Sequence, residues 1–330
     1  MFPENKIINE IFNIENEEQF NKIALQIFDF QFKNNNTYRD YIKKLKIDIS
    51  KIKHFTEIPF LPIDFFKTHK IISSGKKIQT TFRSSGTTGM SRSEHHITDL
   101  SIYDKSFLKT FKIFYGKPDK YIFTALLPSY SEQGSSSLIY MVKKLMQISN
   151  KPDNDFYLYN HQELFEKLSE LEKQNKKTIL FGVSFALIDF FEEYKLSLKN
   201  TIIIETGGMK GRKKEIVREK LHKIIKNATG LKQIHSEYGM TELLSQAYAK
   251  QANKYITPPW MKILIRDTND PFGCLPKGQS GGINIIDLAN LYSCSFVETK
   301  DLGKIHKDNT FEILGRFDNS DVRGCNLMVV

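Results

Sequence analysis

The sequence contains little cysteine and no long apolar run. Its 330 residues include only Cys274, Cys294 and Cys325, too few for the disulfide framework of a small secreted domain. No run of about 18 apolar residues occurs, so no segment is predicted to span a membrane. Residues 1–9 also lack the apolar core of a signal peptide. Together these absences predict a cytoplasmic protein.

Motifs for nucleic acid or zinc are lacking as well. The sequence has no zinc-finger spacing, no RNP-like aromatic block, and neither HExxH nor CxxC. The formal net charge of +10 comes from lysines scattered along the chain. We therefore expect no nucleic-acid partner and no zinc site, whereas nucleotides remain compatible with the charge balance.

The apolar pattern predicts an α/β protein in three parts. Helical spacing over residues 20–28, with Asn16 as N-cap, indicates an N-terminal helical region at 1–54. Strands alternating with helices indicate an α/β core at 55–254. Short strand-like runs between Gly and Pro turns indicate a small β-rich subdomain at 255–330.

Within the core, strands are predicted at 121–127, 178–183, 200–205 and 232–235, and helices at 98–114, 136–147, 162–174 and 213–227.

The first motif with candidate chemistry is Arg83-Ser84-Ser85-Gly86-Thr87-Thr88-Gly89, which follows a predicted strand. Glycines let backbone N–H groups turn toward an anion, and hydroxyls add donors, so the loop suits a polyphosphate. The spacing of a Walker loop is absent. An ordinary turn has the same composition, so the motif alone leaves both interpretations open.

The second motif is Ser236-Glu237-Tyr238-Gly239-Met240-Thr241-Glu242, placed after the predicted strand 232–235. Tyr238 offers a ring for stacking a base, Thr241 a hydroxyl, and Glu242 a carboxylate suited to Mg²⁺. The alternative is a strand-to-helix turn capped by Thr241.

The third and fourth motifs are Thr299-Lys300-Asp301-Leu302-Gly303 and Gly315-Arg316. An aspartate after a strand can accept both hydroxyls of a ribose, although Asp-x-Gly is also a common turn. An arginine in the fourth motif can bridge ribose and phosphate.

In this order the four motifs resemble those of the adenylate-forming (acyl-activating) superfamily, over roughly residues 55–325. The stretches at 58–67 and 205–211, together with Arg323-Gly324-Cys325, look like those of LuxE-type acyl-protein synthetases. The resemblance implies the N-terminal-type domain of that superfamily, with parallel sheets flanked by helices and a small C-terminal β-rich subdomain. It also implies ATP-dependent activation of a fatty acid to an acyl-AMP, and then transfer to a cysteine near the C-terminus.

The resemblance implies ATP and Mg²⁺ as cofactors and an acyl-CoA-reductase-like protein as a partner. Tyr238 would stack on adenine and Asp301 would bind the ribose. Thr241 and Glu242 would serve the α-phosphate and the metal, and Lys210 would neutralise phosphate charge. The nucleotide-binding set is Ser84, Ser85, Gly86, Thr87, Thr88, Gly89, Gly207, Gly208, Tyr238, Gly239, Asp301 and Arg316.

Cys325 is the predicted acyl acceptor by this resemblance. It lies two residues after Arg323, and a nearby cation favours a thiolate, although a lone cysteine is commonly a small buried apolar residue. Only 14 residues follow Arg316, so we expect the C-terminal lid of the superfamily, with its catalytic lysine, to be missing, as the resemblance to LuxE-type enzymes also implies. Two alternatives stay open: an acyl- or aryl-CoA ligase of the phenylacetate type, and a non-catalytic nucleotide- or carrier-binding partner of an acyl reductase.

Overall fold

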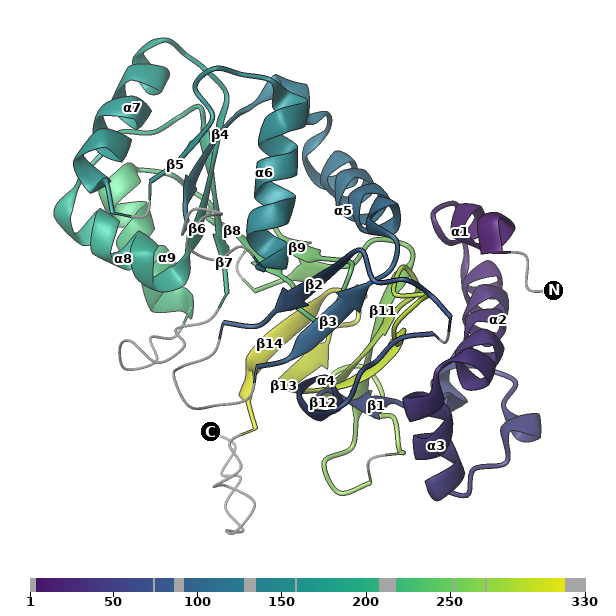
Figure 1. Ribbon diagram of the computed structural model, residues 1–330. Coiled ribbons are helices and arrows are strands. Elements are labelled where there is room, and N and C mark those ends of the chain that lie inside the picture. The colour runs from purple at the N-terminus through teal and green to yellow at the C-terminus, as the bar shows by residue number, and fades with distance from the viewer. Residues whose placement is uncertain are drawn as a thin grey trace.

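The computed structural model describes residues 4–73, 75–85, 92–127, 135–157, 159–207, 218–251, 253–270 and 272–317. Within these residues 12 strands form one large sheet in the order β11-β12-β13-β14-β10-β9-β8-β7-β6-β4-β5, with β1 paired to β13 (Figure 1). A separate antiparallel pair is formed by β2 (Thr80–Arg83) and β3 (Glu94–Ile97). The strands of the large sheet are β1 (Leu61–Pro62), β4 (Ile122–Leu126), β5 (Asp155–Phe156), β6 (Thr178–Val183), β7 (Thr201–Thr206), β8 (His235–Tyr238), β9 (Ala247–Ala249), β10 (Tyr255–Ile256), β11 (Met261–Arg266), β12 (Ser280–Asp287), β13 (Phe296–Ile305) and β14 (Phe311–Arg316).

The helices precede the sheet or connect its strands. No helix in the described ranges is both long enough and apolar enough to cross a membrane. They are α1 (Glu4–Ile11), α2 (Glu17–Asn34), α3 (Asn36–Lys44), α4 (Phe65–Thr68), α5 (Leu100–Tyr115), α6 (Ser137–Ser149), α7 (His161–Lys173), α8 (Ser184–Glu193) and α9 (Arg218–Thr229). Short 3-10 turns are η1 (Ile49–Lys51), η2 (Phe55–Glu57) and η3 (Pro118–Lys120).

The half of the sheet made of β5, β4, β6, β7 and β8 is parallel and covered by helices on both faces. Alternation along β6 shows this directly: Ile179 and Phe181 pack in the cluster that contains α6, whereas Leu180 packs in the cluster that contains α7, α8 and α9. Figure 1 shows the same arrangement, with α6 on one side of these strands and α7 to α9 on the other. A parallel sheet requires such covering because its strands are buried on both faces.

Most of the predicted core elements are confirmed within one to three residues at each end, and strand β6 occupies the predicted 178–183. Helix α8 was not predicted. Most of its residues are buried, including Phe190 and Phe191, so its sequence shows little of the alternation between apolar and polar residues that marks a surface helix. The strand predicted at 232–235 is wrong in position, because β8 is His235–Tyr238 and includes half of the second motif. The described part of the predicted basic helix at 213–227 is α9.

Apart from the short strand β1, which pairs in parallel with β13, the other half of the sheet is antiparallel, and it contains the strands predicted after residue 255. These strands continue the same sheet, since β14 pairs with β10 and β10 with β9. Asp301 does not follow a strand as predicted; it lies inside β13. A register shift between Leu302 and Gly303 interrupts the ladder there, and a side chain at Gly303 would meet the backbone of Glu312. The glycine therefore serves close strand packing rather than a turn.

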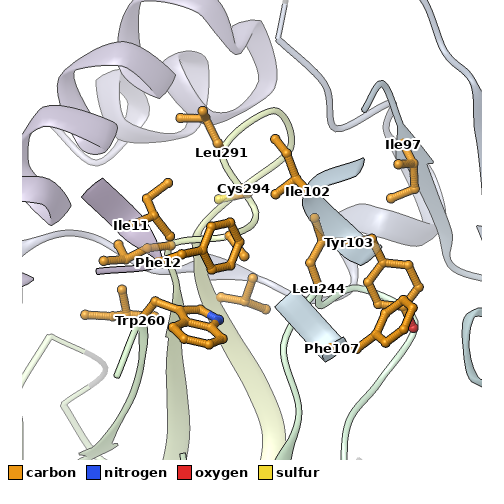
Figure 2. Close-up of a cluster of buried hydrophobic side chains, with 14 of the residues drawn as sticks. Ile11, Phe12, Ile97, Ile102, Tyr103, Phe107, Leu244, Trp260, Leu291 and Cys294 are labelled. Carbon is orange, nitrogen blue, oxygen red and sulfur yellow. The ribbon is translucent and has the colours of Figure 1, made fainter. Parts of the chain in front are cut away.

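The N-terminal helices share a core with the rest of the chain. Helix α2 begins as predicted, with the Asn16 side chain accepting from the Gln19 backbone N–H. Figure 2 shows where the three parts of the chain meet: side chains from the N-terminal region lie beside others from α5 and from the strand-rich part. In this cluster the Phe12 and Trp260 rings pack edge to face, with centroids 5.0 Å apart. The labelled residues are Ile11, Phe12, Ile97, Ile102, Tyr103, Phe107, Leu244, Trp260, Leu291 and Cys294.

Candidate active site

Three residues from three separate motifs meet across β8, β13 and β14. The Tyr238 hydroxyl donates to Asp301 Oδ2 at 2.7 Å, and Arg316 Nε donates to Asp301 Oδ1 at 2.9 Å. Asp301 and Arg316 are paired residues of the antiparallel ladder, which explains how they meet. The carboxylate of Asp301 is almost fully buried, whereas about half of the Arg316 side chain is exposed. The sequence predicted all three residues for one nucleotide, and the fold brings them within hydrogen-bond distance.

Asp301 keeps acceptor capacity in this arrangement. Each carboxylate oxygen has two lone pairs, and one hydrogen bond to each oxygen leaves room for two further donors, such as the hydroxyls of a ribose. Burial and the neighbouring Asp301 charge hold the pKa of Tyr238 well above 10, so the phenol stays a donor to the aspartate. The Tyr238 ring also packs edge-on against Tyr255 and Phe311. Its stacking on adenine stays a prediction.

The segment that carries Thr241 and Glu242 is a connection between strands. It leads from β8 to β9, so the alternative of a strand-to-helix turn capped by Thr241 is wrong. Gly239 at its start allows close packing, because a side chain there would clash with the carboxylate of Glu237. Glu242 is largely buried. Its carboxylate stays the predicted metal ligand.

The hydroxyl-rich loop connects the hairpin strands β2 and β3. Arg83 ends β2 and pairs with Glu94 of β3, both in the ladder and by an Arg83 Nε to Glu94 Oε1 bond of 2.8 Å. Ser84 closes the hairpin, since its N–H donates to the Ser93 carbonyl and its hydroxyl accepts from the Ser93 N–H. Ser85 is the last described residue before the centre of the loop. The predicted phosphate-binding residues Gly86, Thr87, Thr88 and Gly89 lie outside the described residues.

Gly207 lies at the carboxyl end of β7, beside the carboxyl end of β8. Its φ of +72° is favourable only for glycine, and its carbonyl accepts from the Ser184 hydroxyl at 2.7 Å. Ligands of parallel α/β sheets bind outside the carboxyl ends of strands, which fits the predicted approach of a nucleotide. Gly208 and Lys210 lie outside the described residues, as does Cys325. Cys274 is exposed, and Cys294 is buried in the core.

A family model described as acyl-protein synthetase, LuxE, matches residues 9–330. The chain belongs to the LuxE acyl-protein synthetase family. A search of curated protein sequences finds no match to it.

Solved structures similar to this LuxE-family chain show its fold. ATP-bound MatB from Rhodopseudomonas palustris has a TM-score of 0.56 and 15% identity, covering 86% of this chain and 58% of its own. A 2-hydroxyisobutyryl-CoA ligase in complex with 2-HIB-AMP has a TM-score of 0.67 and 12% identity, covering 92% of this chain and 68% of its own. The chain spans 49% to 58% of the length of MatB and two MatB chimeras. The predicted adenylate-forming fold is confirmed.

A buried ion pair beside the site was missed by sequence reasoning. Glu205 of β7 accepts from Arg218 Nε at 2.7 Å and from the Ser184 hydroxyl at 3.1 Å. Burial alone would raise the pKa of Glu205, but the hydrogen bond from His222 and the charge of Arg218 outweigh it and lower the pKa. Arg218 opens α9 and Ser184 opens α8, so the pair joins two helices to the end of β7. The signal available in the sequence was a glutamate directly after the apolar run of a buried strand, since a buried charge needs a partner.

Glu237 of β8 is the second buried carboxyl that the sequence analysis did not single out. It lies on the opposite face of the sheet from Glu205, where the Thr206 hydroxyl donates to its Oε2. Burial raises the pKa of Glu237 to about 7, against the hydrogen bond from Thr206. The Glu237 carboxyl group therefore titrates near neutral pH, and it packs closely against Gly239.

Glu237 should make the stability of the protein fall with pH. Its pKa rises from 4.5 to about 7 on folding, so between these values the folded state binds more protons than the unfolded state. The contribution of Glu237 to the free energy of unfolding is complete below 4.5 and is lost toward 7, at most about 1.4 kcal/mol per pH unit. Urea denaturation at a series of pH values should show a steeper decline for the wild type than for Glu237→Gln. Equal slopes would contradict the assignment; Asp287, with a pKa raised to about 6 by burial, is present in both proteins.

The residues present fit one magnesium ion held together with substrate phosphates. In the described part of the chain, no group of three or more His, Cys, Asp or Glu side chains gathers to hold a metal alone. Mg²⁺ usually takes only one or two carboxylates from the protein and the rest of its ligands from phosphates and water. Glu242, which is buried in the connection between β8 and β9, stays the predicted source of such a carboxylate.

Proposed function

We propose that this LuxE-family protein uses ATP to activate a carboxylic acid, a fatty acid by the family resemblance, and transfers the acyl group to the thiol of Cys325. The observation that carries the proposal is the meeting of Tyr238, Asp301 and Arg316, which offers a buried carboxylate to a ribose and an exposed guanidinium beside it. Membership of the LuxE family supports the same reaction.

The proposed reaction has two steps. A carboxylate oxygen attacks the α-phosphorus of ATP; the new O–P bond forms as the bond to the leaving pyrophosphate breaks, which gives an acyl-adenylate. The Cys325 thiolate then attacks the acyl carbon, forming a thioester and releasing AMP. The first step needs mainly positioning and charge neutralisation, since phosphoryl transfer asks for little covalent chemistry from the protein.

The chain's own residues divide this work. Asp301 would bind the ribose hydroxyls while Tyr238 and Arg316 hold its carboxylate, and the half-exposed Arg316 would bridge ribose and phosphate. Glu242 holds Mg²⁺, which neutralises phosphate charge when bound. Thr241 donates to the α-phosphate. Lys210 and the Ser84–Gly89 loop hold the remaining phosphates.

The fatty acid, ATP, the protein partner and the location in this proposal rest on the similarity to known proteins. The fatty acid follows from the LuxE-type match, and ATP is supported by the ATP-bound state of MatB. An acyl-CoA-reductase-like protein that receives the acyl group, and a cytoplasmic location, belong to the same proposal. The three parts predicted for the chain, 1–54, 55–254 and 255–330, are proposed as its domains.

Intact-mass spectrometry tests the function directly. The purified protein is incubated with Mg-ATP and, in separate reactions, with saturated, hydroxylated and aromatic acids of different lengths. We expect an ATP-dependent mass increase of one acyl group, labile to hydroxylamine, with the best fatty acid. Carboxylate-dependent pyrophosphate release without an adduct would contradict self-acylation and indicate an external acceptor such as CoA. If neither an adduct nor pyrophosphate release is detected, the result would contradict acid activation and favour a binding role.

A further inference from the structure

Two side chains from distant parts of the chain hold the backbone of the Thr241–Glu242 segment. His95 Nδ1 lies 2.8 Å from the Thr241 carbonyl, and Asn290 Nδ2 donates to the Glu242 carbonyl at 2.8 Å. The two side chains also meet, because His95 Nε2 lies 2.9 Å from Asn290 Oδ1. His95 belongs to β3, directly after the hydroxyl-rich loop, and Asn290 to the turn between β12 and β13. One hydrogen-bonded unit therefore joins the second motif to the strand that follows the first motif and to the turn that precedes the strand carrying the third motif.

A third side chain holds the same segment a few residues further on. Asp287, at the end of β12, accepts from the N–H groups of Leu244 and Ser245 at 2.8 and 2.9 Å and from the Ser245 hydroxyl at 2.6 Å. The Leu244 side chain packs in the central apolar cluster shown in Figure 2. The backbone is thus fixed by carbonyl contacts at its start and amide contacts at its end, which leaves little freedom between them.

The turn from 287 to 295 is itself anchored by the N-terminal helix α2. Gln31 is fully buried; its amide nitrogen donates to the carbonyls of Asn290 and Leu291, and its oxygen accepts from the Ser295 N–H at 3.0 Å. Asn35 donates to the Ser293 carbonyl at 2.9 Å. These contacts tie the turn to α2, in addition to its contacts with the Thr241–Glu242 segment.

None of the three holding side chains is placed to touch a substrate. His95, Asn290 and Asp287 are each at most 1% exposed. The cavity that His95 and Asn290 line has a volume of about 10 Å³, room for about one water molecule and none for an acyl chain or a nucleotide. Their effect on a reaction must pass through the backbone that they hold.

We propose that His95, Asn290 and Asp287 form a bracket that positions Thr241 and Glu242 for the transfer of the adenylyl group of ATP to the carboxylate. The inference rests on the proposed function, since it assigns the bracket a role in that reaction. All three are positioning residues. A displacement of about 1 Å in a reacting group can cost roughly 100-fold in rate, so loss of the bracket should appear in kcat.

The chemistry of His95 supplies two matched variants. Burial lowers the pKa of His95 to about 4, so the ring is neutral and carries one N–H, which we place on Nδ1, where it donates to the Thr241 carbonyl. The amide nitrogen of asparagine stands as many bonds from Cβ as Nδ1 does, and that of glutamine as many as Nε2 does. His95→Asn therefore keeps a donor toward the Thr241 carbonyl, and His95→Gln keeps one only toward Asn290.

The kinetic experiment compares these variants by ATP–pyrophosphate exchange. We expect His95→Gln to lower kcat roughly 10- to 100-fold with the KM for ATP within about threefold, and His95→Asn to keep kcat within about threefold of the wild type. Ser149→Ala, at the end of α6 and away from the bracket, removes a partly buried hydrogen bond to the Tyr121 carbonyl and controls for general destabilisation. If His95→Gln fails to fold, Asn290→Asp, which loses the donor to Glu242, takes its place. Equal kcat values for the two His95 variants, or a loss in Ser149→Ala as well, would overturn the proposal.

Amide hydrogen exchange gives a second measurement that needs no activity. In Asp287→Ala the Leu244 and Ser245 N–H groups lose the carboxylate oxygen that they share, and we expect their exchange to accelerate about 10-fold or more over the wild type, with no such change in Ser149→Ala. Unchanged exchange would refute the bracket. If the wild type catalyses no pyrophosphate exchange with any acid, the proposed function fails and the positioning role with it, while faster exchange in Asp287→Ala would still support the structural role of Asp287 in fixing this segment.

Discussion

Cys325→Ser is expected to abolish the ATP-dependent acyl adduct, from about one acyl group per chain to none. A serine hydroxyl is almost entirely protonated near neutral pH, whereas a cysteine beside a cation such as Arg323 carries a reactive thiolate fraction. The first step needs no acceptor, so ATP–pyrophosphate exchange should persist in the variant. Intact-mass spectrometry and exchange of labelled pyrophosphate measure the two steps separately.

Cys274→Ser is the matched control for this prediction, because Cys274 is an exposed thiol of the described chain. It should keep the adduct. An adduct of unchanged size on Cys325→Ser would refute Cys325 as the acceptor, and peptide mapping would then identify the residue that carries the acyl group. Loss of exchange together with the adduct would also contradict the separation into two steps.

Asp301→Ala is expected to raise the KM for ATP by about 100-fold or more. The change removes the acceptor for the ribose hydroxyls and leaves Tyr238 and Arg316 without the group that orients them. Hydrogen bonds to a charged group contribute about 1.5–3 kcal/mol each, and two of them account for an effect of this size. Steady-state kinetics at saturating acid gives the KM, and thermal melting reports the accompanying loss of stability.

Two further variants sharpen this prediction. Tyr238→Phe keeps the ring but removes the hydroxyl that holds Asp301, and should raise the KM for ATP by about 10-fold, consistent with one charged hydrogen bond. Asp308→Ala removes an exposed carboxylate from the turn between β13 and β14 and should leave the KM unchanged. A KM for Asp301→Ala equal to that of Asp308→Ala would refute ribose binding by Asp301.

The sequence predicted which residues form the site but not the secondary structure that carries them. It singled out Tyr238, Asp301 and Arg316, which the fold does bring together. It placed both Tyr238 and Asp301 after strands, with a turn as the alternative for Asp301, whereas Tyr238 is the last residue of β8 and Asp301 lies inside β13. Gly and Asp are enriched in turns, and here the packing of β13 against its neighbours overrides that preference.

The bracket and the buried carboxyls were beyond sequence reasoning for a different reason. In the sequence His95 stands beside His96 and belongs to none of the four motifs; the structure buries it, with Nδ1 2.8 Å from the Thr241 carbonyl and Nε2 2.9 Å from Asn290 Oδ1. Glu205 and Glu237 lie on consecutive, neighbouring strands, β7 and β8, and the opposite shifts of their pKa follow from the His222 hydrogen bond and the Arg218 charge on one face of the sheet and from burial on the other. A local pattern reports that such a side chain is buried, not which distant group it meets.

By itself the sequence determined the alternating α/β architecture, the cap of α2, the position of β6 and the order of the motifs that mark the superfamily. These features depend on residues within one helix, one strand or one turn of each other. Only the tertiary structure decided that the strand-rich part continues the same sheet, that Asp301 faces Tyr238 and Arg316, and that α2 supports the turn holding the Thr241–Glu242 segment. Those contacts join residues up to 264 positions apart, and they arise from sheet register and burial, which no local pattern encodes.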